Sequence, residues 1–449
     1  MAKQALIFTD PDYGLDMPQW SDMLTEANFA VWSHCVHSED RPDDVSMAAD
    51  ILLVDLLDVS KDRVALVVER ASALRKSLGF SQARVPMVAI ADPSVALREE
   101  LLTPFADVLK PPLTLDLISN RLTSLMRLAT MRREAERRSR TFKRFGVGLP
   151  VVPPPSNLEN QSLLYLGSGM AFLPVECALP ETISTTAALT PAMALHYLEN
   201  ESFDTLVVEL SDYNEHLIHF IGDLRRNPNY FSFPIILLCH KEATEDGLAG
   251  LAAGANDIVT FPFSERFFEN RIEILVNEER YRRQLKKIFN EARLLMPTDA
   301  TTRLYSEEFL KAHLQVLHEQ ENTASMTFAG IDISFDLVQG ERREQSPSPA
   351  LLARVGRMIY SLMRAEDLLA RLDNGRFVAF FPDTDLFETR IALQRIRSIV
   401  QLSPFVEQNS GMGVNVVLDF SLHHCDSNKV DFDIERILKD LFENPVVRF

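Results

Sequence analysis

The sequence lacks any long apolar run. Its longest uninterrupted apolar stretches are short pieces such as residues 233–239, whereas a helix needs roughly 18 apolar residues to cross a bilayer. The apolar stretch at residues 5–8 is followed at once by Asp10 and Asp12, so it is too short for a signal peptide. We therefore expect a cytoplasmic protein that does not insert into a membrane.

Basic residues and paired cysteines are also scarce. The 46 Lys and Arg are outnumbered by 64 Asp and Glu, giving a formal net charge of −18, and this argues against DNA binding, which needs clustered cations. The four cysteines include no CxxC pair, so they are expected to be reduced and offer no zinc template. His423, His424 and Cys425 are adjacent, but three neighbours on an extended strand cannot all face one metal.

The length of 449 residues predicts about three folded domains, at roughly 150 residues each. In the first two thirds, short apolar runs alternate with helix-like stretches. The runs lie at residues 5–8, 51–54, 85–90 and 108–109, and again at residues 163–166, 205–210, 233–239 and 257–260. Strands separated by amphipathic helices favour parallel sheets covered by helices on both faces. We therefore predict two doubly wound α/β domains.

A long helix pattern stands near the end of each of these two domains. The first runs from Pro112 to about Arg144, and its basic end is expected to be a solvated face. Its arginines there are Arg132, Arg133, Arg137, Arg138 and Arg140. The second runs from Ser264 to about Leu295, before Pro297, and is either a dimer or signalling stalk or a helix that closes its own domain.

Residues 146–155 read GVGLPVVPPP, which is stiffened towards polyproline II and marks a linker. We predict domains at residues 1–140, 161–285 and 286–449, with the Pro-rich linker at residues 141–160.

Carboxylates follow the predicted strands of the first domain. Asp10 follows the first strand, Asp55 ends the strand at residues 51–55, and Lys110 follows the last. Carboxyl ends of parallel strands meet at one edge of a sheet, where acids can hold Mg²⁺. This order resembles receiver domains of response regulators, which have the flavodoxin-like (βα)5 fold. The resemblance implies that Asp55 is the phosphoacceptor, that Asp10 and Asp12 supply acid for Mg²⁺ at Asp10 and Asp55, and that Lys110 neutralises the phosphate.

Two residues of this domain depart from the receiver pattern. Pro11 stands where the family has a second acid, and Ala91 where a Thr or Ser senses the phosphate. The alternative is that Asp55 is only a turn residue at a strand end.

The second domain repeats the same order without the chemistry. Its counterparts are Gly167, Ser168 and Gly169 for the acids, Glu209 for the acceptor, Cys239 for the Thr and Phe261 for the Lys. Without cation-holding carboxylates such a site cannot collect Mg²⁺. We expect a degenerate receiver that packs against its neighbour or against a second copy, the latter giving a homodimer, as in PleD-type regulators.

The C-terminal third resembles the GGDEF domain of diguanylate cyclases. Residues 299–309, DATTRLYSEEF, are similar to the opening motif of that family, and Asp332 follows an apolar strand as the family's metal-binding Asp does. The signature hairpin corresponds to Asp373, Asn374, Gly375, Arg376 and Phe377. Because the glycines and acids of the signature are replaced, and a cation stands where a metal ligand belongs, we expect a degenerate domain without cyclase activity.

Arg364 and Asp367 preserve the family's RxxD element, which implies a site for cyclic di-GMP. An arginine fork can pair with phosphate or guanine, a carboxylate can accept from guanine, and residues three apart share one face near a helix end. Arg395 matches a second guanidinium of that site, and Arg357 lies two turns before Arg364. The alternative is a surface salt bridge.

The preferred hypothesis is a cyclic di-GMP effector of two-component and cell-cycle signalling. The resemblance implies partners of the adaptor or protease-substrate type and a place at the cell pole. The alternatives are an active diguanylate cyclase with an unusual signature and a ligand-independent scaffold.

Overall fold

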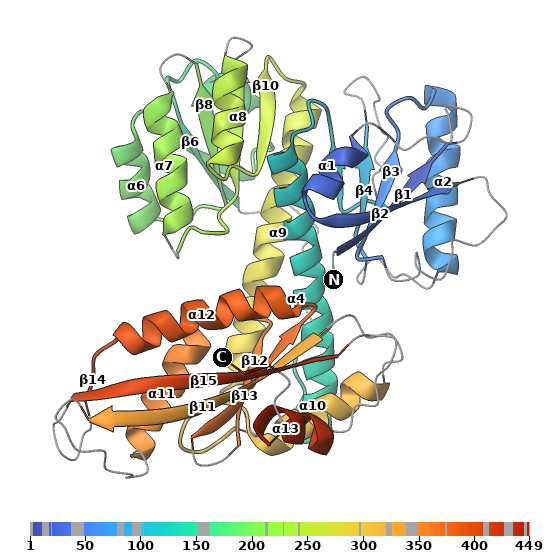
Figure 1. The fold of residues 1–449 in the computed structure, drawn as a ribbon. Coiled ribbons are helices and arrows are strands. Elements are labelled where there is room, and N and C mark those ends of the chain that lie inside the picture. The colour runs from blue at the N-terminus through green and yellow to red at the C-terminus, as the bar shows by residue number, and fades with distance from the viewer. Residues whose placement is uncertain are drawn as a thin grey trace. The chain divides into compact units, whose positions relative to one another are not determined.

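The computed structural model describes the chain in segments and divides it into two compact units. The described residues are 3–10, 18, 20–36, 49–78, 85–91, 101, 103–150, 161–211, 214–227, 229–240, 243–295, 298–319, 326–337, 348–372, 375–406, 413–425, 434–443 and 447–448. The first unit joins Ala2–Ala129 to Pro153–Arg283, and the second joins Thr130–Val152 to Gln284–Phe449. Figure 1 shows the helices and strands of both units.

The first domain of the first unit is a parallel sheet in the order β2-β1-β3-β4-β5. Its elements are β1 (Lys3–Thr9), α1 (Ser21–Glu26), β2 (Phe29–Cys35), β3 (Ile51–Asp55), α2 (Lys61–Ser77), β4 (Met87–Ile90), β5 (Asp107–Leu109) and α4 (Leu115–Arg144). Side chains alternate along β1, so that Leu6 and Phe8 pack with α2 while Ala5 and Ile7 pack with α1 and α4. This is the predicted doubly wound sheet.

The second domain has the same strand order, read as β7-β6-β8-β9-β10. Its elements are β6 (Gln161–Leu166), α5 (Phe172–Cys177), β7 (Ile183–Ala188), α6 (Pro191–Asn200), β8 (Thr205–Leu210), α7 (Glu215–Arg226), β9 (Ile235–His240), α8 (Thr244–Ala252), β10 (Asp257–Phe261) and α9 (Glu265–Ala292). Helices α6, α7 and α8 cover one face, and α5 and α9 cover the other. The flavodoxin-like fold predicted for both domains is confirmed.

The second unit contains a mainly antiparallel sheet in the order β12-β13-β11-β15-β14, with β16 beside β15. Its elements are α10 (Glu307–Glu319), β11 (Met326–Leu337), α11 (Pro349–Ser361), β12 (Leu368–Arg371), β13 (Arg376–Pro382), α12 (Leu386–Leu402), β14 (Phe405–Val406), β15 (Gly413–Cys425), α13 (Ile434–Phe442) and β16 (Val447–Arg448). Helices α11 and α12 pack on one face of the sheet, and α10 and α13 on the other.

The helices α4 and α9 match the two long helices that the sequence predicts. The expectation that the basic end of α4 is a solvated face is wrong for two of its arginines. Arg137 and Arg138 near the end of α4 are 3% and 0% exposed, not solvated. Both pair with Glu134 on the same helix, and the Arg138 Nε lies 2.8 Å from its Oε1. In the part of the chain that the structure describes, no helix combines the length and apolar character needed to span a membrane.

Candidate functional site

The RxxD residues form a turn between α11 and β12. The Asp367 N–H donates to the Arg364 carbonyl at 3.1 Å, and the Asp367 carboxylate accepts from the Arg364 backbone N–H at 2.8 Å. Arg364 is exposed, whereas Asp367 is only 2% exposed. The expected helical face is therefore wrong, because α11 ends at Ser361. In this geometry the Asp367 carboxylate shapes the turn and the Arg364 side chain reaches the surface.

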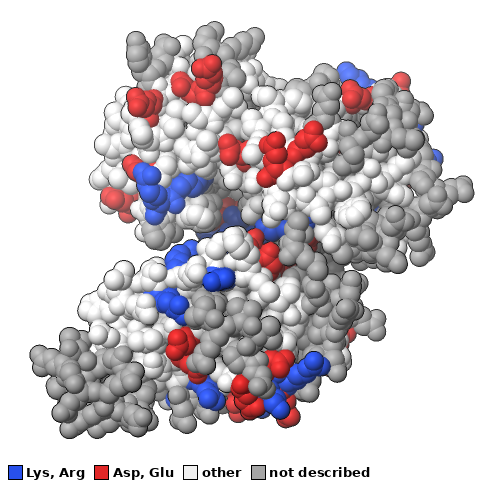
Figure 2. All heavy atoms as spheres, viewed as in Figure 1, with Lys and Arg blue, Asp and Glu red and all other residues white. Residues whose placement is uncertain are grey.

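A second exposed guanidinium reaches the same turn from α12. The Arg395 Nη2 donates to the carbonyl of Leu362 at 3.2 Å, and Leu362 lies two residues before Arg364. Arg357 is exposed on α11, and its Nε donates to the Ala353 carbonyl of the same helix at 3.2 Å. Figure 2 shows separate Lys or Arg side chains over the region where α12 lies in Figure 1. The Arg395 guanidinium thus lies at the C-terminal end of α11, two residues before Arg364.

The inner side of this turn is held by Arg138, a residue that sequence reasoning missed. The Arg138 Nη2 donates to the carbonyls of Glu366 at 2.6 Å and Asp367 at 2.9 Å. The only signal in the sequence was the basic run on α4, and nothing in that run indicates a partner more than two hundred residues away.

The signature hairpin pairs an arginine with the aspartate assigned to metal. Asp332 on β11 and Arg376 on β13 are register partners, and the Arg376 Nε lies 3.4 Å from the Asp332 Oδ1. The Arg376 guanidinium also lies over the Phe442 ring, 5.2 Å from its centroid. A guanidinium therefore occupies the neighbourhood of this carboxylate, where a cation would otherwise bind.

Gly375 in the same hairpin has a φ of +90°, a conformation that L side chains rarely adopt. A Cβ built there would lie 3.1 Å from the backbone oxygen of Ile333, and the Ile333 N–H donates to the Gly375 carbonyl at 3.0 Å. Phe377, the last residue of the signature, is fully buried in the core of the domain.

The acceptor candidate of the first domain lies at the carboxyl edge of its sheet. Asp55 ends β3, and one of its oxygens accepts from the Leu57 N–H at 3.2 Å. Burial raises the pKa of Asp55 above its ordinary value. Asp10 is 4% exposed, and its Oδ1 lies 3.1 Å from the Nη2 of Arg63, a partner that sequence reasoning did not find.

Lys110 follows β5, as predicted, and its Nζ lies 3.7 Å from the centroid of the Phe267 ring on α9. This contact links the two receiver-type domains within the first unit.

Three predicted site residues, Asp12, Asp373 and Asn374, lie outside the described residues. Among the residues that are described, no cluster of three or more His, Cys, Asp or Glu side chains is arranged to hold a metal ion. The Mg²⁺ site at Asp10 and Asp55 stays a prediction.

In the second domain, Glu209 fills the place of the acceptor and is enclosed by donors. Its carboxylate accepts from the Ser168 hydroxyl at 2.7 Å and from the backbone N–H groups of Gly169 at 3.1 Å and Ala171 at 3.0 Å. The His240 Nε2 lies 3.2 Å away. Burial alone would raise the pKa of Glu209, but interactions with Tyr165, Ser168, His240 and the Ala171 N–H, in decreasing order, outweigh it and hold the pKa below its ordinary value.

The other two counterparts in this domain are apolar in character. Burial raises the pKa of the Cys239 thiol to about 12, so the thiol stays protonated at neutral pH. The Phe261 ring packs against the ring of His240, with centroids 4.9 Å apart. His240 is the last residue of β9, and its role was not predicted.

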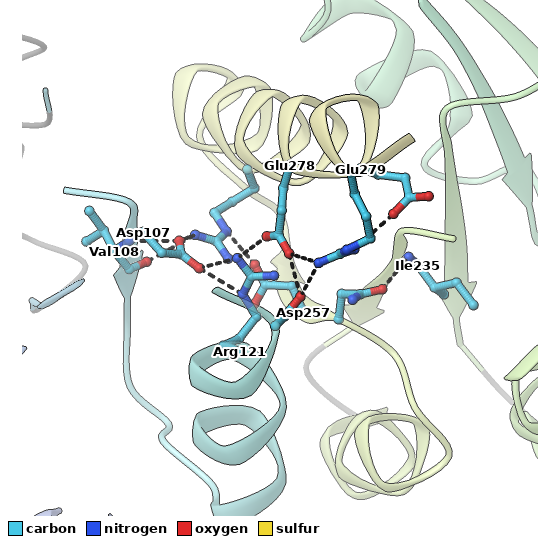
Figure 3. Close-up of polar contacts among 11 residues, drawn as sticks. Asp107, Val108, Arg121, Ile235, Asp257, Glu278 and Glu279 are labelled. Carbon is cyan, nitrogen blue, oxygen red and sulfur yellow. Dashed lines mark hydrogen bonds and ion pairs between the residues drawn. The ribbon is translucent and has the colours of Figure 1, made fainter. Parts of the chain in front are cut away.

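An Asp–Arg pair is repeated in the two receiver-type domains and lies at the boundary between them (Figure 3). Asp107 at the start of β5 pairs with Arg121, and Asp257 at the start of β10 pairs with Arg271, each arginine lying 14 residues after its aspartate. Each aspartate also accepts from the N–H of the residue that follows it. Each domain thus contains one such Asp–Arg pair, formed by corresponding residues.

These pairs are connected across the boundary between the domains. Arg271 also contacts the Asp107 carboxylate and donates to the Val108 carbonyl at 3.1 Å, while Arg121 lies 3.0 Å from Glu278 of α9. Burial would raise the pKa of Asp107, but Arg271 and Arg121 hold it well below its usual range. The second receiver-type domain therefore packs against its neighbour, which was one of the two predicted arrangements.

Comparison with known proteins agrees with this architecture. Residues 296–440 match the family model "Diguanylate cyclase, GGDEF domain". The response regulator PleD of Caulobacter vibrioides is 23% identical over 221 residues, which cover 49% of each chain. The transcriptional regulatory protein BasR of Escherichia coli K12 is 27% identical over 119 residues, which cover 26% of this chain and 50% of BasR. The chain spans about half the length of the curated relatives it matches.

Among solved structures, the GGDEF domain of DgcB from Caulobacter crescentus, in complex with c-di-GMP, is 17% identical. The match covers 32% of this chain and 85% of that chain, with a TM-score of 0.27. Residues 296–440 therefore match the GGDEF domain family, and about half of the chain is similar to the response regulator PleD.

Proposed function

We propose that the chain is an effector that binds cyclic di-GMP at the RxxD turn, through Arg364, Asp367 and Arg395, with Arg357 at the rim of the site. The observation that carries this proposal is that the exposed Arg395 of α12 contacts the C-cap residue of α11, Leu362, two residues before the exposed Arg364 of the RxxD turn.

The chemistry of these groups suits a guanine dinucleotide. Guanidinium donors are planar and match phosphate oxygens or the Hoogsteen edge of guanine. The Asp367 carboxylate is proposed to accept from guanine N1–H and N2–H while its Oδ2 keeps the hydrogen bond from the Arg364 N–H, since each carboxylate oxygen can accept more than one hydrogen bond.

The same domain is proposed to be inactive as a cyclase. Cyclisation of GTP needs carboxylates that hold metal ions, and here Asp332 is paired with Arg376. Purified protein incubated with GTP and Mg²⁺ is expected to form no cyclic di-GMP. Product formation that depends on Asp332 would support the cyclase alternative instead.

The proposed output is the recruitment of protein partners. The layout resembles PopA, a PleD-type paralogue with a degenerate cyclase domain, and that resemblance implies partners of the adaptor or protease-substrate type and a place at the cell pole. Homodimer formation through the receiver-type domains also stays a prediction.

Titration calorimetry with cyclic di-GMP tests the site. We expect wild-type protein to bind with a Kd of about 1 μM or tighter, and Arg364→Ala and Arg395→Ala each to weaken binding by at least about tenfold, since each removes a charge-assisted hydrogen bond. Arg390→Ala, which removes another exposed arginine of α12, is the matched control and should bind like wild type.

Equal titration curves for wild type and Arg364→Ala would contradict the proposed site. Absence of binding by every protein would favour the ligand-independent scaffold.

A further inference from the structure

Arg138 is a fully buried arginine that the proposed ligand contacts do not use. Its guanidinium donates to the Glu134 carboxylate and lies over the Phe289 ring, 4.5 Å from the centroid. A buried charge is costly unless it is paired and hydrogen-bonded. The remaining contacts of Arg138 therefore indicate what the domain gains from keeping it.

Those contacts fall on the last two residues of the RxxD turn. One nitrogen, Nη2, donates to the carbonyls of both Glu366 and Asp367. On the other side, the turn is closed by the two hydrogen bonds between Asp367 and Arg364. With both carbonyls directed at Arg138, the two peptide planes are fixed, and the backbone of the turn is held between two sets of hydrogen bonds.

We propose that Arg138 is a positioning residue for the cyclic di-GMP site. It holds the peptides of Glu366 and Asp367 from inside the domain, and this fixes where Arg364 emerges from the turn. The proposal rests on the proposed function and adds to it a residue that lies on α4, far from the RxxD element in the sequence.

The planar guanidinium explains why an arginine is needed. Arg138 holds Glu134 through Nε while the end of the same rigid fork reaches both carbonyls. A lysine ammonium keeps the charge but is a single point on a flexible stem, so it cannot reproduce this arrangement. Arg138→Lys therefore separates the geometry of the fork from its charge.

The test compares Arg138→Lys with wild type in the full chain, by hydrogen–deuterium exchange without ligand and by calorimetry with cyclic di-GMP. We expect faster amide exchange confined to peptides that cover residues 362–370, and affinity weakened about tenfold, because the ligand must then order a turn that is no longer held in place. Exchange is decisive because a general loss of stability would raise it throughout the domain.

Two matched variants act as controls. Glu134→Gln removes the buried partner but leaves the two carbonyl contacts, so any rise in exchange should be spread over the domain and not concentrated at the turn, and affinity should be unchanged. Arg271→Lys alters an equally buried arginine of the first unit and should leave both readouts unchanged. If Arg138→Lys does not fold, the neutral pair Glu134→Gln/Arg138→Gln removes both charges together and is measured in the same way.

The outcomes separate this inference from the proposed function. Unchanged exchange and affinity in Arg138→Lys would overturn the positioning role while leaving the ligand site standing. A wild-type protein that binds no cyclic di-GMP would overturn the proposed function and with it the positioning of a ligand site. Faster exchange restricted to the turn, together with weaker binding, supports both.

Discussion

The two receiver-type domains share a fold but differ at the carboxyl edges of their sheets. In the first, Asp55 ends its strand and accepts a hydrogen bond from the Leu57 N–H, and burial raises its pKa. In the second, Glu209 occupies the corresponding place, accepts from the Ser168 hydroxyl and two backbone N–H groups, lies beside His240, and has a lowered pKa. The first carboxylate is a group whose charge is poorly supported, and the second is a structural anion.

This difference shows which residues carry the fold and which carry the chemistry. The buried strands and the Asp–Arg pairs at a 14-residue spacing are common to both domains. Only a few residues at the strand ends distinguish an edge with a partly buried carboxylate from one filled by its own donors. The same fold therefore holds two chemically different edges in one chain.

The largest loss of stability is expected from removing the buried Asp–Arg pairs that the two domains share. Asp107→Ala leaves Arg121 and Arg271 buried without this carboxylate, so the free energy of unfolding should fall by about 3–5 kcal/mol. Asp257→Ala should lower the free energy of unfolding by less. Asp257 is more exposed than Asp107, and among the described residues its ion pair is with one arginine, Arg271, whereas Asp107 pairs with two. Urea unfolding, followed by the fluorescence of Trp20 and Trp32, measures the difference. Equal losses would contradict the ranking.

The second-largest loss of stability is expected from replacing Glu209. Glu209→Gln replaces an anion among donors by an amide, and should cost about 1–3 kcal/mol at neutral pH. Because the folded-state pKa of Glu209 is lowered, its stabilisation is present above the ordinary Glu value of about 4.3 and is lost as the pH falls through the folded pKa. The unfolding free energies of wild type and variant should therefore converge in acid, and a constant gap would argue against this account.

Asp55 should respond in the opposite direction. Its folded-state pKa is raised, so the ionised form at neutral pH is slightly unfavourable, and Asp55→Asn should stabilise the fold by no more than about 1 kcal/mol. The stability of wild type should rise towards the variant's as the pH falls through the raised pKa. Asp58→Asn, at an exposed neighbour, is the control and should leave stability nearly unchanged. A loss of stability in Asp55→Asn would refute the contrast with Glu209.

The smallest effect concerns chemistry and not stability. A small-molecule phosphoryl donor with Mg²⁺ is expected to label a minor fraction of wild-type protein, because Arg63 already neutralises Asp10 in part and Pro11 replaces an acid. Mass spectrometry should detect the phosphoryl group on Asp55 and lose it in Asp55→Asn, with Glu209→Gln labelled like wild type. Labelling that survives in Asp55→Asn would place the acceptor elsewhere.

In the two receiver-type domains, the central strands and the edge strands β5 and β10 were predictable from the sequence, but the edge strand on the other side of each sheet was not. Each run that the pattern predicted corresponds to a strand, such as β3 or β8, which is buried and almost wholly apolar. The two missed strands, β2 and β7, lie at sheet edges. The sequence of β7, ISTTAA, has no apolar run, since an edge strand needs to cover less of the core.

The candidate sites were predictable as residues but not as contacts. Arg364, Asp367 and Arg395 were found by their motif, yet the return of the Asp367 carboxylate to its own turn depends on a backbone conformation that no spacing reveals. Arg138 was missed because a charge run is ordinarily solvated, and burial of one member depends on where the rest of the chain folds.

Gly375 also limits which substitutions the signature hairpin can accept. In the proposed alignment this residue stands where the family has an acid, yet its positive φ and the nearby Ile333 oxygen leave little room for any side chain. A change of Gly375 to Asp or Glu would strain the hairpin before it could supply a metal ligand. An acid could be placed at this position only if the backbone of the hairpin changed as well.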